Sequence, residues 1–242
     1  MSSFINRIHA YVRESRILRR GASVRPDAAP GGQHKEYPRM PRVTLPDPTS
    51  TSASLESVLQ DRSSFDRSAS DRAFSKDEMG TLLGLALGAR KKKWSRNYPS
   101  AGALFPIETY VIGNVLEDAD SEVFHYHPTA HALEHLWPLP GNFDMARMIR
   151  SSVTPLSSTL IIFTSVWERS AKKYGDFAYS HALLEAGHMA QNILLVATAI
   201  GAQCRPVAGC EDSYVAELLD LDPEAEQFVY GILLSPPSRK KV

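Results

Sequence analysis

The sequence predicts an α+β fold, and three observations support this class. At least three segments have the β-branched and aromatic composition of strands, and others have the apolar spacing and end signals of helices. The two kinds follow one another without the strict alternation of a doubly wound sheet. With 242 residues, 43% of them hydrophobic and 22% charged, the chain can bury a core that supports itself.

The composition argues against several classes of protein. Cys204 and Cys210 are too few for a disulfide framework, and their spacing fits neither a zinc knuckle nor a CxxC redox motif. The longest apolar run, Ile193 to Ala202, is about half of the roughly 20 residues that a membrane helix needs. The first twenty residues lack the order of a secretory signal. We therefore expect a cytoplasmic protein without a membrane segment.

Residues 1–48 are predicted to form a basic arm that precedes a domain of residues 49–242. Residues 1–42 carry nine Lys and Arg against three Asp and Glu, a net charge of +6, and the rest of the chain carries −6. Residues 4–20 have the pattern of a short amphipathic helix, and the Pro-rich and Gly-rich segment 21–48 is predicted as a linker outside the core. The arm could dock a partner or stay solvated. No groove-reading motif supports nucleic acid binding.

The compact part of the chain is predicted to begin near Ser54 with two helices. Apolar residues at helical spacing predict a short helix that runs into Arg62. Ser75 and Glu78 have the spacing of a capping box, so a second helix is expected to begin there. Leucines at helical spacing continue this helix to Gly88, where it should end.

Strands and one long helix follow. Three segments rich in β-branched and aromatic residues are predicted as strands, namely Glu108–Gly113, Val123–Tyr126 and Leu160–Trp167. The longest helix is predicted over Phe177–Ile200, and Gly201 should end it. Its second half is apolar on nearly every side. We therefore expect this helix to lie in the core or at a subunit interface.

The last part of the chain is predicted to add two strands and one helix. Gln203–Val207 and Gln227–Leu234 have the composition of strands, and Asp212 is placed to begin a helix between them. Because helices and strands do not alternate strictly over the whole domain, the pattern favours an α+β protein over a doubly wound parallel sheet.

Basic side chains at two places suit an anionic group. Arg62, Ser64 and Arg67 lie just beyond the first predicted helix, and guanidinium groups hold phosphates bidentately. Arg239 and Lys241 give the end of the sequence a positive charge. Each pattern alone is equally typical of a surface turn or a solvated terminus. The chain lacks GxGxxG, GxxxxGK[ST], HExxH and GxSxG, which argues against the simplest nucleotide-binding, zinc-protease and hydrolase classes.

Two segments of small residues could approach a flat ligand closely and present backbone N–H groups to it. They consist of Pro99, Ser100, Ala101 and Gly102 before a strand, and of Pro206, Ala208 and Gly209 after one. Taken alone, each is also typical of a tight turn. Both segments consist of residues with small side chains.

Lys173 and Tyr174 are adjacent groups that can carry a proton in catalysis. The simpler alternative is that Lys173 and its neighbour Lys172 are solvated charges. Four histidines at positions 125, 127, 131 and 135 raise the question of a metal, but the stretch has no acidic or thiol pattern of a known site. No metal is expected.

Taken in order, these segments resemble the nitroreductase superfamily of flavin enzymes. More narrowly, they resemble the azoline dehydrogenases that form thiazoles and oxazoles in modified peptides, of the streptolysin S and microcin B17 type. The resemblance covers about residues 34–242, and PSAGALFPIETY and LLEAGHMAQNILL are its most specific parts. The other segments are RSSFDR, VFHYHPTAHALEHL, KKYG, PVAG and YGILL.

The resemblance implies a mixed sheet flanked by helices, in an intertwined homodimer that binds FMN at each of two subunit interfaces. The long helix Phe177–Ile200 would then lie in the dimer core. The segment Pro99–Gly102 matches a loop that reaches across the interface to the flavin of the partner. Ala103 stands where nitroreductases usually have Asn, and this departure favours the dehydrogenase branch.

The resemblance also implies roles for individual residues. Arg62 and Ser64 match the family motif that holds polar groups of the flavin, whereas Asp66 stands where a basic residue is expected and Arg67 comes one position late. The turn of Pro206, Ala208 and Gly209 matches the one that faces the flavin ring. Arg239 or Lys241 matches a terminal phosphate clamp, and Lys173 and Tyr174 match a pair of proton-transfer residues.

The implied function is FMN-dependent oxidation of a thiazoline or oxazoline ring in natural-product biosynthesis, on a peptide or a carrier-bound substrate. One alternative is an FMN-dependent NAD(P)H reductase of nitro compounds or quinones. Another is a noncatalytic FMN-binding subunit that supports a cyclodehydratase complex. The expected partners are a second copy of the chain, the azoline substrate and a cyclodehydratase.

Overall fold

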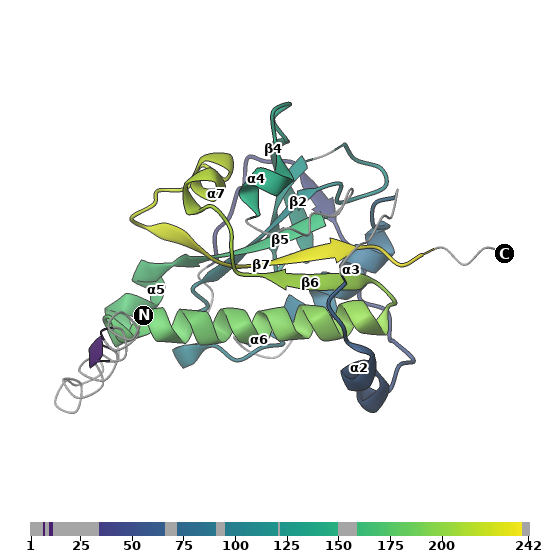
Figure 1. Cartoon of the computed structure of the whole chain (residues 1–242), viewed down its shortest axis with the longest axis horizontal. Coiled ribbons are helices and arrows are strands. Elements are labelled where there is room, and N and C mark those ends of the chain that lie inside the picture. The colour runs from purple at the N-terminus through teal and green to yellow at the C-terminus, as the bar shows by residue number, and fades with distance from the viewer. Residues whose placement is uncertain are drawn as a thin grey trace.

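The computed structural model of the chain has a seven-stranded sheet with helices on both faces (Figure 1). It describes residues 34–65, 72–90, 95–120, 122–149 and 159–238, together with Arg7, Ala10 and Tyr11. The strand order is β1-β4-β3-β2-β5-β7-β6. The strands are β1 (Arg42–Thr44), β2 (Ile107–Gly113), β3 (Glu122–His127), β4 (Ala132–Pro138), β5 (Thr159–Val166), β6 (Gln203–Val207) and β7 (Glu226–Ser235). The helices are α2 (Leu55–Asp61), α3 (Lys76–Leu87), α4 (Met145–Met148), α5 (Trp167–Tyr174), α6 (Phe177–Ala199) and α7 (Asp212–Leu218), with a short 3-10 turn at Ala101–Ala103.

The predicted helix starts are confirmed, because their caps form as the sequence requires. The Ser54 hydroxyl accepts a hydrogen bond from the Ser57 amide at 3.1 Å and begins α2. At α3, the Glu78 amide donates to the Ser75 hydroxyl and the Ser75 amide donates to the Glu78 carboxylate, a complete capping box. The long helix α6 is also confirmed, and the residue after its cap, Gly201, has a φ of 76°.

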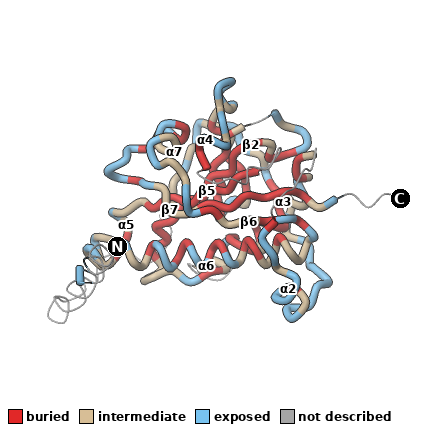
Figure 2. The backbone as a smooth tube through the Cα atoms, viewed as in Figure 1, coloured by how far each residue is buried: buried red, intermediate tan, exposed pale blue. Residues whose placement is uncertain are grey.

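Strand β2 lies at the centre of the sheet and divides the core into two layers. Val111 packs in the layer formed with α3 and α6, whereas its neighbours Tyr110 and Ile112 pack in the layer formed with α7 and α4. This alternation is the ordinary two-residue period of a strand. Figure 2 shows that buried residues concentrate in the central strands and that α2 is largely exposed.

Helix α6 runs along one face of the sheet (Figure 1). It buries nine side chains, including Glu185, and its first turns leave Tyr179, Leu183 and Leu184 exposed. Among the described residues, no helix combines the length and the apolar character needed to cross a bilayer.

The structure differs from the sequence predictions in five elements. Strand β1 and the buried Leu45 lie in the segment predicted as a linker, because β1 pairs with β4 and this pairing cannot be read locally. Strand β4 and helices α4 and α5 were not predicted, and the strand expected to reach Trp167 ends one residue earlier, at Val166.

The α+β class is confirmed, but the sheet is not mixed. All six pairings between the described strands are antiparallel. The helix predicted over residues 4–20 lies outside the described residues, apart from Arg7, Ala10 and Tyr11, which are helical.

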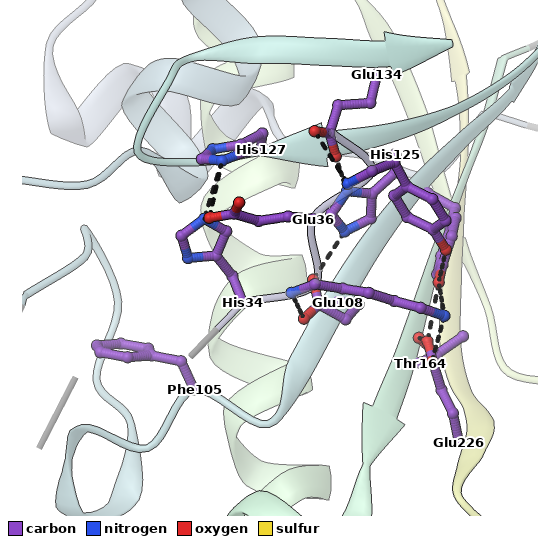
Figure 3. A network of polar contacts seen from close by, with 12 residues as sticks. His34, Glu36, Phe105, Glu108, His125, His127, Glu134, Thr164 and Glu226 are labelled. Carbon is purple, nitrogen blue, oxygen red and sulfur yellow. Dashed lines mark hydrogen bonds and ion pairs between the residues drawn. The ribbon is translucent and has the colours of Figure 1, made fainter. Parts of the chain in front are cut away.

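A buried ionic network joins three of these elements (Figure 3). His125 of β3 is fully buried, and its two ring nitrogens contact Glu134 at 2.9 Å and Glu108 at 2.8 Å. Burial lowers the pKa of His125, but the hydrogen bonds and charges of both glutamates outweigh it and raise the pKa above its ordinary value. Because both ring nitrogens face carboxylate oxygens, only the protonated ring can donate to both. Burial alone would raise the pKa of Glu108 and Glu134, yet His125, together with a neighbouring arginine and a backbone N–H in each case, lowers it to about 2.

Peripheral cations complete the charge balance of this network. Arg42 of β1 donates to Glu134 at 2.7 Å, and Arg169 of α5 pairs with Glu108. Lys35 donates its amide to Glu108 and its ammonium group to Glu226, at 2.7 Å and 2.8 Å. The network therefore fixes the segment before β1 and helix α5 against the sheet.

Replacement of His125 tests how far the fold depends on this network. The substitution His125→Gln removes the positive charge between two buried carboxylates and is expected to lower the free energy of unfolding by about 3–5 kcal/mol. Urea denaturation measures this change. The control is His135→Gln on β4, whose ring pairs with Glu122 at 3.3 Å and is partly exposed, and for which a loss below about 1 kcal/mol is expected. Equal losses in the two variants would contradict the assignment.

Candidate functional site

Lys173 and Tyr174 lie directly against the loop of small residues that ends in Gly102. A β-carbon built on Gly102 would lie 2.6 Å from the Tyr174 hydroxyl oxygen and 3.0 Å from the Lys173 ammonium nitrogen. Gly102 also has a φ of 64°, in the region that favours glycine. The structure therefore brings together the predicted proton-transfer pair and one of the predicted cofactor segments.

The loop is held in shape by its own backbone and by helix α5. The Ser100 hydroxyl accepts a hydrogen bond from the Phe105 amide at 2.9 Å, across the 3-10 turn. Arg169 of α5 donates to the carbonyl oxygen of Phe105 at 3.1 Å while it pairs with Glu108. Since Lys173 lies one turn further along the same helix, Arg169 fixes the pair and the loop relative to each other.

The end of α5 is also packed against the start of α6. Gly175, with a φ of 53°, ends α5, and its amide donates to the Ala171 carbonyl at 2.7 Å. The ring of Tyr174 meets the ring of His181 edge-on, with centroids 4.6 Å apart. Tyr174 is thus positioned by Gly102 on one side and by His181 on the other.

A cavity of about 420 Å³ opens beside these helices. Its lining includes aromatic and aliphatic side chains from α5, α6 and β7, among them Trp167, Tyr179, Leu183 and Phe228. Polar and acidic side chains, among them Asp212 and Glu226, complete the lining, and ligand pockets in proteins commonly have this size. The cavity can therefore hold a small ring compound near the start of α5.

The second group of predicted residues surrounds strand β6. The backbone of Ser64 forms an isolated parallel β-bridge with Cys204 of β6, and the Phe65 amide donates to the Cys204 carbonyl at 3.3 Å. Arg205 of the same strand donates back to the Phe65 carbonyl at 2.9 Å. These bonds hold the segment after α2 beside the strand that leads to Pro206, Ala208 and Gly209.

The Arg62 amide donates to the Val58 carbonyl at 3.0 Å, but its guanidinium has no hydrogen bond or ion pair with the residues that the structure describes. Such a guanidinium, two positions before the Ser64 hydroxyl in the sequence, can donate hydrogen bonds to an anionic ligand. Arg67, Arg239 and Lys241, which were predicted to share this role, lie outside the described residues.

The two groups lie near opposite ends of α6 (Figure 1). Helix α5, with Lys173 and Tyr174, lies beside the start of α6, and α2, which leads into Arg62, lies beside its end. A helix of 23 residues is about 35 Å long. Tyr174 contacts His181 of α6, and Cys204, the partner of Ser64, contacts the Leu194 carbonyl, which lies about 20 Å further along the helix.

Glu185 is a residue of this site that sequence reasoning missed. It lies on α6 with 2% of its surface exposed, and neither carboxylate oxygen makes a well-formed hydrogen bond to a described residue. Burial raises the pKa of Glu185 to about 7, although a weak interaction with Ser100 and the charges of Arg96 and Arg169 oppose this. The signal in the sequence was that Glu185 is the one carboxylate in the helix of 23 residues.

All four central histidines contact protein groups, and His127 accepts a hydrogen bond from the Ala130 amide. His125 lies between its two glutamates, and His135 pairs with Glu122. The ring of His131 contacts the Tyr126 hydroxyl and the Pro46 carbonyl, each at 2.9 Å. These contacts explain why the histidines of β3 and β4 do not form a site among themselves.

Comparison with known proteins identifies the family to which this sequence is similar. The family model described as "Nitroreductase family" matches residues 59–234. The microcin B17-processing protein McbC of Escherichia coli is 36% identical over 137 residues, which are 52% of this chain and 49% of McbC. The chain is thus matched to about half the length of that relative.

Solved structures share the fold over most of the chain. A chain of the E. coli microcin synthetase McbBCD complex with truncated pro-MccB17 bound has a TM-score of 0.59 and 26% identity, over 81% of this chain and 78% of that one. A nitroreductase-like protein of Ralstonia eutropha has a TM-score of 0.69 and 20% identity, over 82% of this chain and 90% of that one. The predicted nitroreductase-like architecture is confirmed.

The substitution Glu185→Gln tests the buried carboxyl. With a pKa of about 7 in the folded protein against an ordinary value of 4.5, Glu185 contributes stability that is complete below about pH 4.5. This contribution is lost as the pH rises through 7, because a buried charge then forms. Thermal or urea unfolding between pH 5 and 8 should show that the wild type loses about 2–3 kcal/mol relative to Glu185→Gln. The exposed control Glu217→Gln should follow the wild type, and parallel curves for all three proteins would refute the pKa assignment.

Proposed function

Because the chain belongs to the nitroreductase family, we propose that it is an FMN-dependent azoline dehydrogenase. It would oxidise a thiazoline or oxazoline ring to the thiazole or oxazole, on a modified peptide or a carrier-bound intermediate. The observation that carries this proposal is the contact of Lys173 and Tyr174 with Gly102. The similarity to McbC, a microcin B17-processing protein, favours the same branch of the family.

The residues present fit FMN. The uncommitted guanidinium of Arg62 and the hydroxyl of Ser64 suit its anionic and polar groups, together with Arg67 and with Arg239 or Lys241. Pro99, Ser100, Ala101 and Gly102 form one backbone surface for the ring, and Pro206, Ala208 and Gly209 form another. When bound, FMN supplies hydride acceptance, the chemistry that no side chain of the protein offers.

The protein itself has to move a proton. Oxidation of an azoline to an azole removes two hydrogens from the ring, one as a hydride and one as a proton. Lys173 or Tyr174 would take the proton, since both polar atoms lie at the loop that forms the cofactor surface. Arg169 would keep the pair in register with that loop through the Phe105 carbonyl.

The separation of the two residue groups favours a homodimer with composite sites. Each site would combine Arg62 and Ser64 of one chain with the loop, Lys173 and Tyr174 of the other. Large apolar side chains that are exposed in the single chain support such an interface. They include Tyr179 at 55% and Leu184 at 62% on α6, and Leu55 at 66% on α2.

The substrate chemistry also implies a partner. An azoline ring in a peptide arises by loss of water between a Cys or Ser side chain and the preceding carbonyl, so a cyclodehydratase must act before this chain. The similarity to a chain of the McbBCD complex supports direct association with such an enzyme.

The visible spectrum under anaerobic conditions tests the cofactor and the reaction together. We expect a flavin band that bleaches when a thiazoline-containing peptide is added and returns in air. A band that responds only to NADPH would establish the alternative, an NAD(P)H reductase of nitro compounds or quinones. A colourless protein without affinity for FMN would show a noncatalytic subunit of a cyclodehydratase complex.

Substitutions of the proton-transfer pair should separate chemistry from cofactor binding. Lys173→Ala and Tyr174→Phe are each expected to keep the flavin band and to lose turnover of the azoline by about 100-fold or more. Lys172→Ala is the control, because Lys172 is solvent-exposed and pairs with Glu168 on the surface. If both variants oxidise the azoline at the wild-type rate, the proposed roles are wrong.

Mixed dimers test whether each site is shared between two chains. Arg62→Ala and Lys173→Ala, carrying different tags and purified as doubly tagged dimers, should regain about half of the wild-type activity, since one of two composite sites is intact. Dimers of Lys173→Ala with Tyr174→Phe should stay inactive, because every site then lacks one member of the pair. Absence of recovery in the first mixture would place all site residues within one chain.

A further inference from the structure

Three ligand atoms from distant parts of the sequence converge beside the end of β3 (Figure 3). Nε2 of His34 lies 3.0 Å from Nε2 of His127, and Oε1 of Glu36 lies 3.2 Å and 3.7 Å from these two nitrogens. Both rings are largely buried, with 9% and 7% of their side-chain surface exposed, whereas 53% of the Glu36 side chain is exposed. The cluster is therefore anchored on one side and open to solvent on the other.

We propose that His34, Glu36 and His127 bind a divalent cation, with Zn²⁺ as the best fit, and that this ion fastens the segment before β1 to the sheet. Two imidazoles and one carboxylate are an established ligand set for zinc, with a fourth position left for water. Tetrahedral ligands at bonds of about 2.0–2.1 Å lie roughly 3.3 Å from one another. The three observed separations of 3.0, 3.2 and 3.7 Å lie around that value.

Hydrogen bonding alone leaves this cluster incompletely satisfied. The Ala130 amide donates to Nδ1 of His127 at 3.0 Å, so a neutral His127 carries its proton on Nε2 and donates it to His34. The carboxylate oxygen of Glu36 then faces the same accepting nitrogen of His34, lone pair against lone pair, at 3.2 Å. A cation at the centre of the three atoms would replace this repulsion by three attractive contacts.

The same hydrogen bond sets a limit on the affinity. To bind a cation through Nε2, His127 must carry its proton on Nδ1 instead, and the Ala130 amide must release that nitrogen. Binding therefore competes with a hydrogen bond of the turn after β3. This competition favours reversible binding over a permanent structural zinc.

The backbone explains how three such separate residues meet. His34 and Glu36 are alternate residues of a chain segment without helix, so their side chains can leave the backbone on the same side. Lys35 points away from them, toward Glu226. Because His127 lies more than ninety positions later, the spacing of residues in the sequence gives no metal motif.

The test uses the full chain, freed of metal by dialysis against a chelator and titrated with ZnCl₂ in competition with a zinc indicator. One zinc ion per chain is expected, with two imidazole ligands in the zinc X-ray absorption spectrum. At a hundredfold excess over Kd, zinc should raise Tm by about 5–10 °C. Glu36→Gln, at an exposed position that should not affect folding, is expected to weaken binding at least tenfold, and His127→Asn at least a hundredfold.

The control is His188→Gln, at an exposed position on α6, which should bind zinc as the wild type does. Absence of zinc binding by the wild type would overturn the proposal and leave a hydrogen-bonded pair of histidines. Binding that is unaffected by Glu36→Gln and His127→Asn would overturn it as well, by placing the ion elsewhere. These outcomes do not depend on azoline oxidation, since no step of the measurement requires substrate or turnover.

Discussion

A charged imidazole between two buried carboxylates is the interaction on which the rest of the structure depends. His125 joins Glu108 of β2 to Glu134 of β4, and removing these charges from water is unfavourable unless every one of them is paired. The remaining carboxylate charge draws Arg42 from β1 and Arg169 from α5. The need to pair every buried charge in the sheet thus positions β1 at one edge of the sheet and α5, the helix that carries Lys173.

Sequence patterns predicted a helix or strand correctly where the interactions that form it join residues close together in the sequence. The capping box of Ser75 and Glu78 and the apolar run of α6 predict helices that the structure contains. Strands β1 and β4 depend on pairing between distant segments, so their short sequences carried little signal. Arg42 illustrates the limit, because it counted as one charge of a basic arm although its partner Glu134 is fully buried.

The candidate site could be predicted in part for the same reason. The residues of the loop and of the Lys173–Tyr174 pair were identified by resemblance to a family, which orders segments without giving distances. Their contact at Gly102 is visible only in three dimensions, where a single added carbon would collide with both side chains. Glu185 was missed because an acidic residue on a helix is ordinarily solvated, and only the packing of α6 shows that this one is buried.

The edges of the sheet limit how this protein can associate with others. Strand β1 has only three residues between Pro41 and Leu45–Pro46, and β6 at the other edge contains Pro206, which has no amide hydrogen to donate. Neither edge therefore offers a long row of unpaired backbone groups to a further strand. Such blunt edges protect against sheet-to-sheet aggregation during folding, when the strands are transiently exposed.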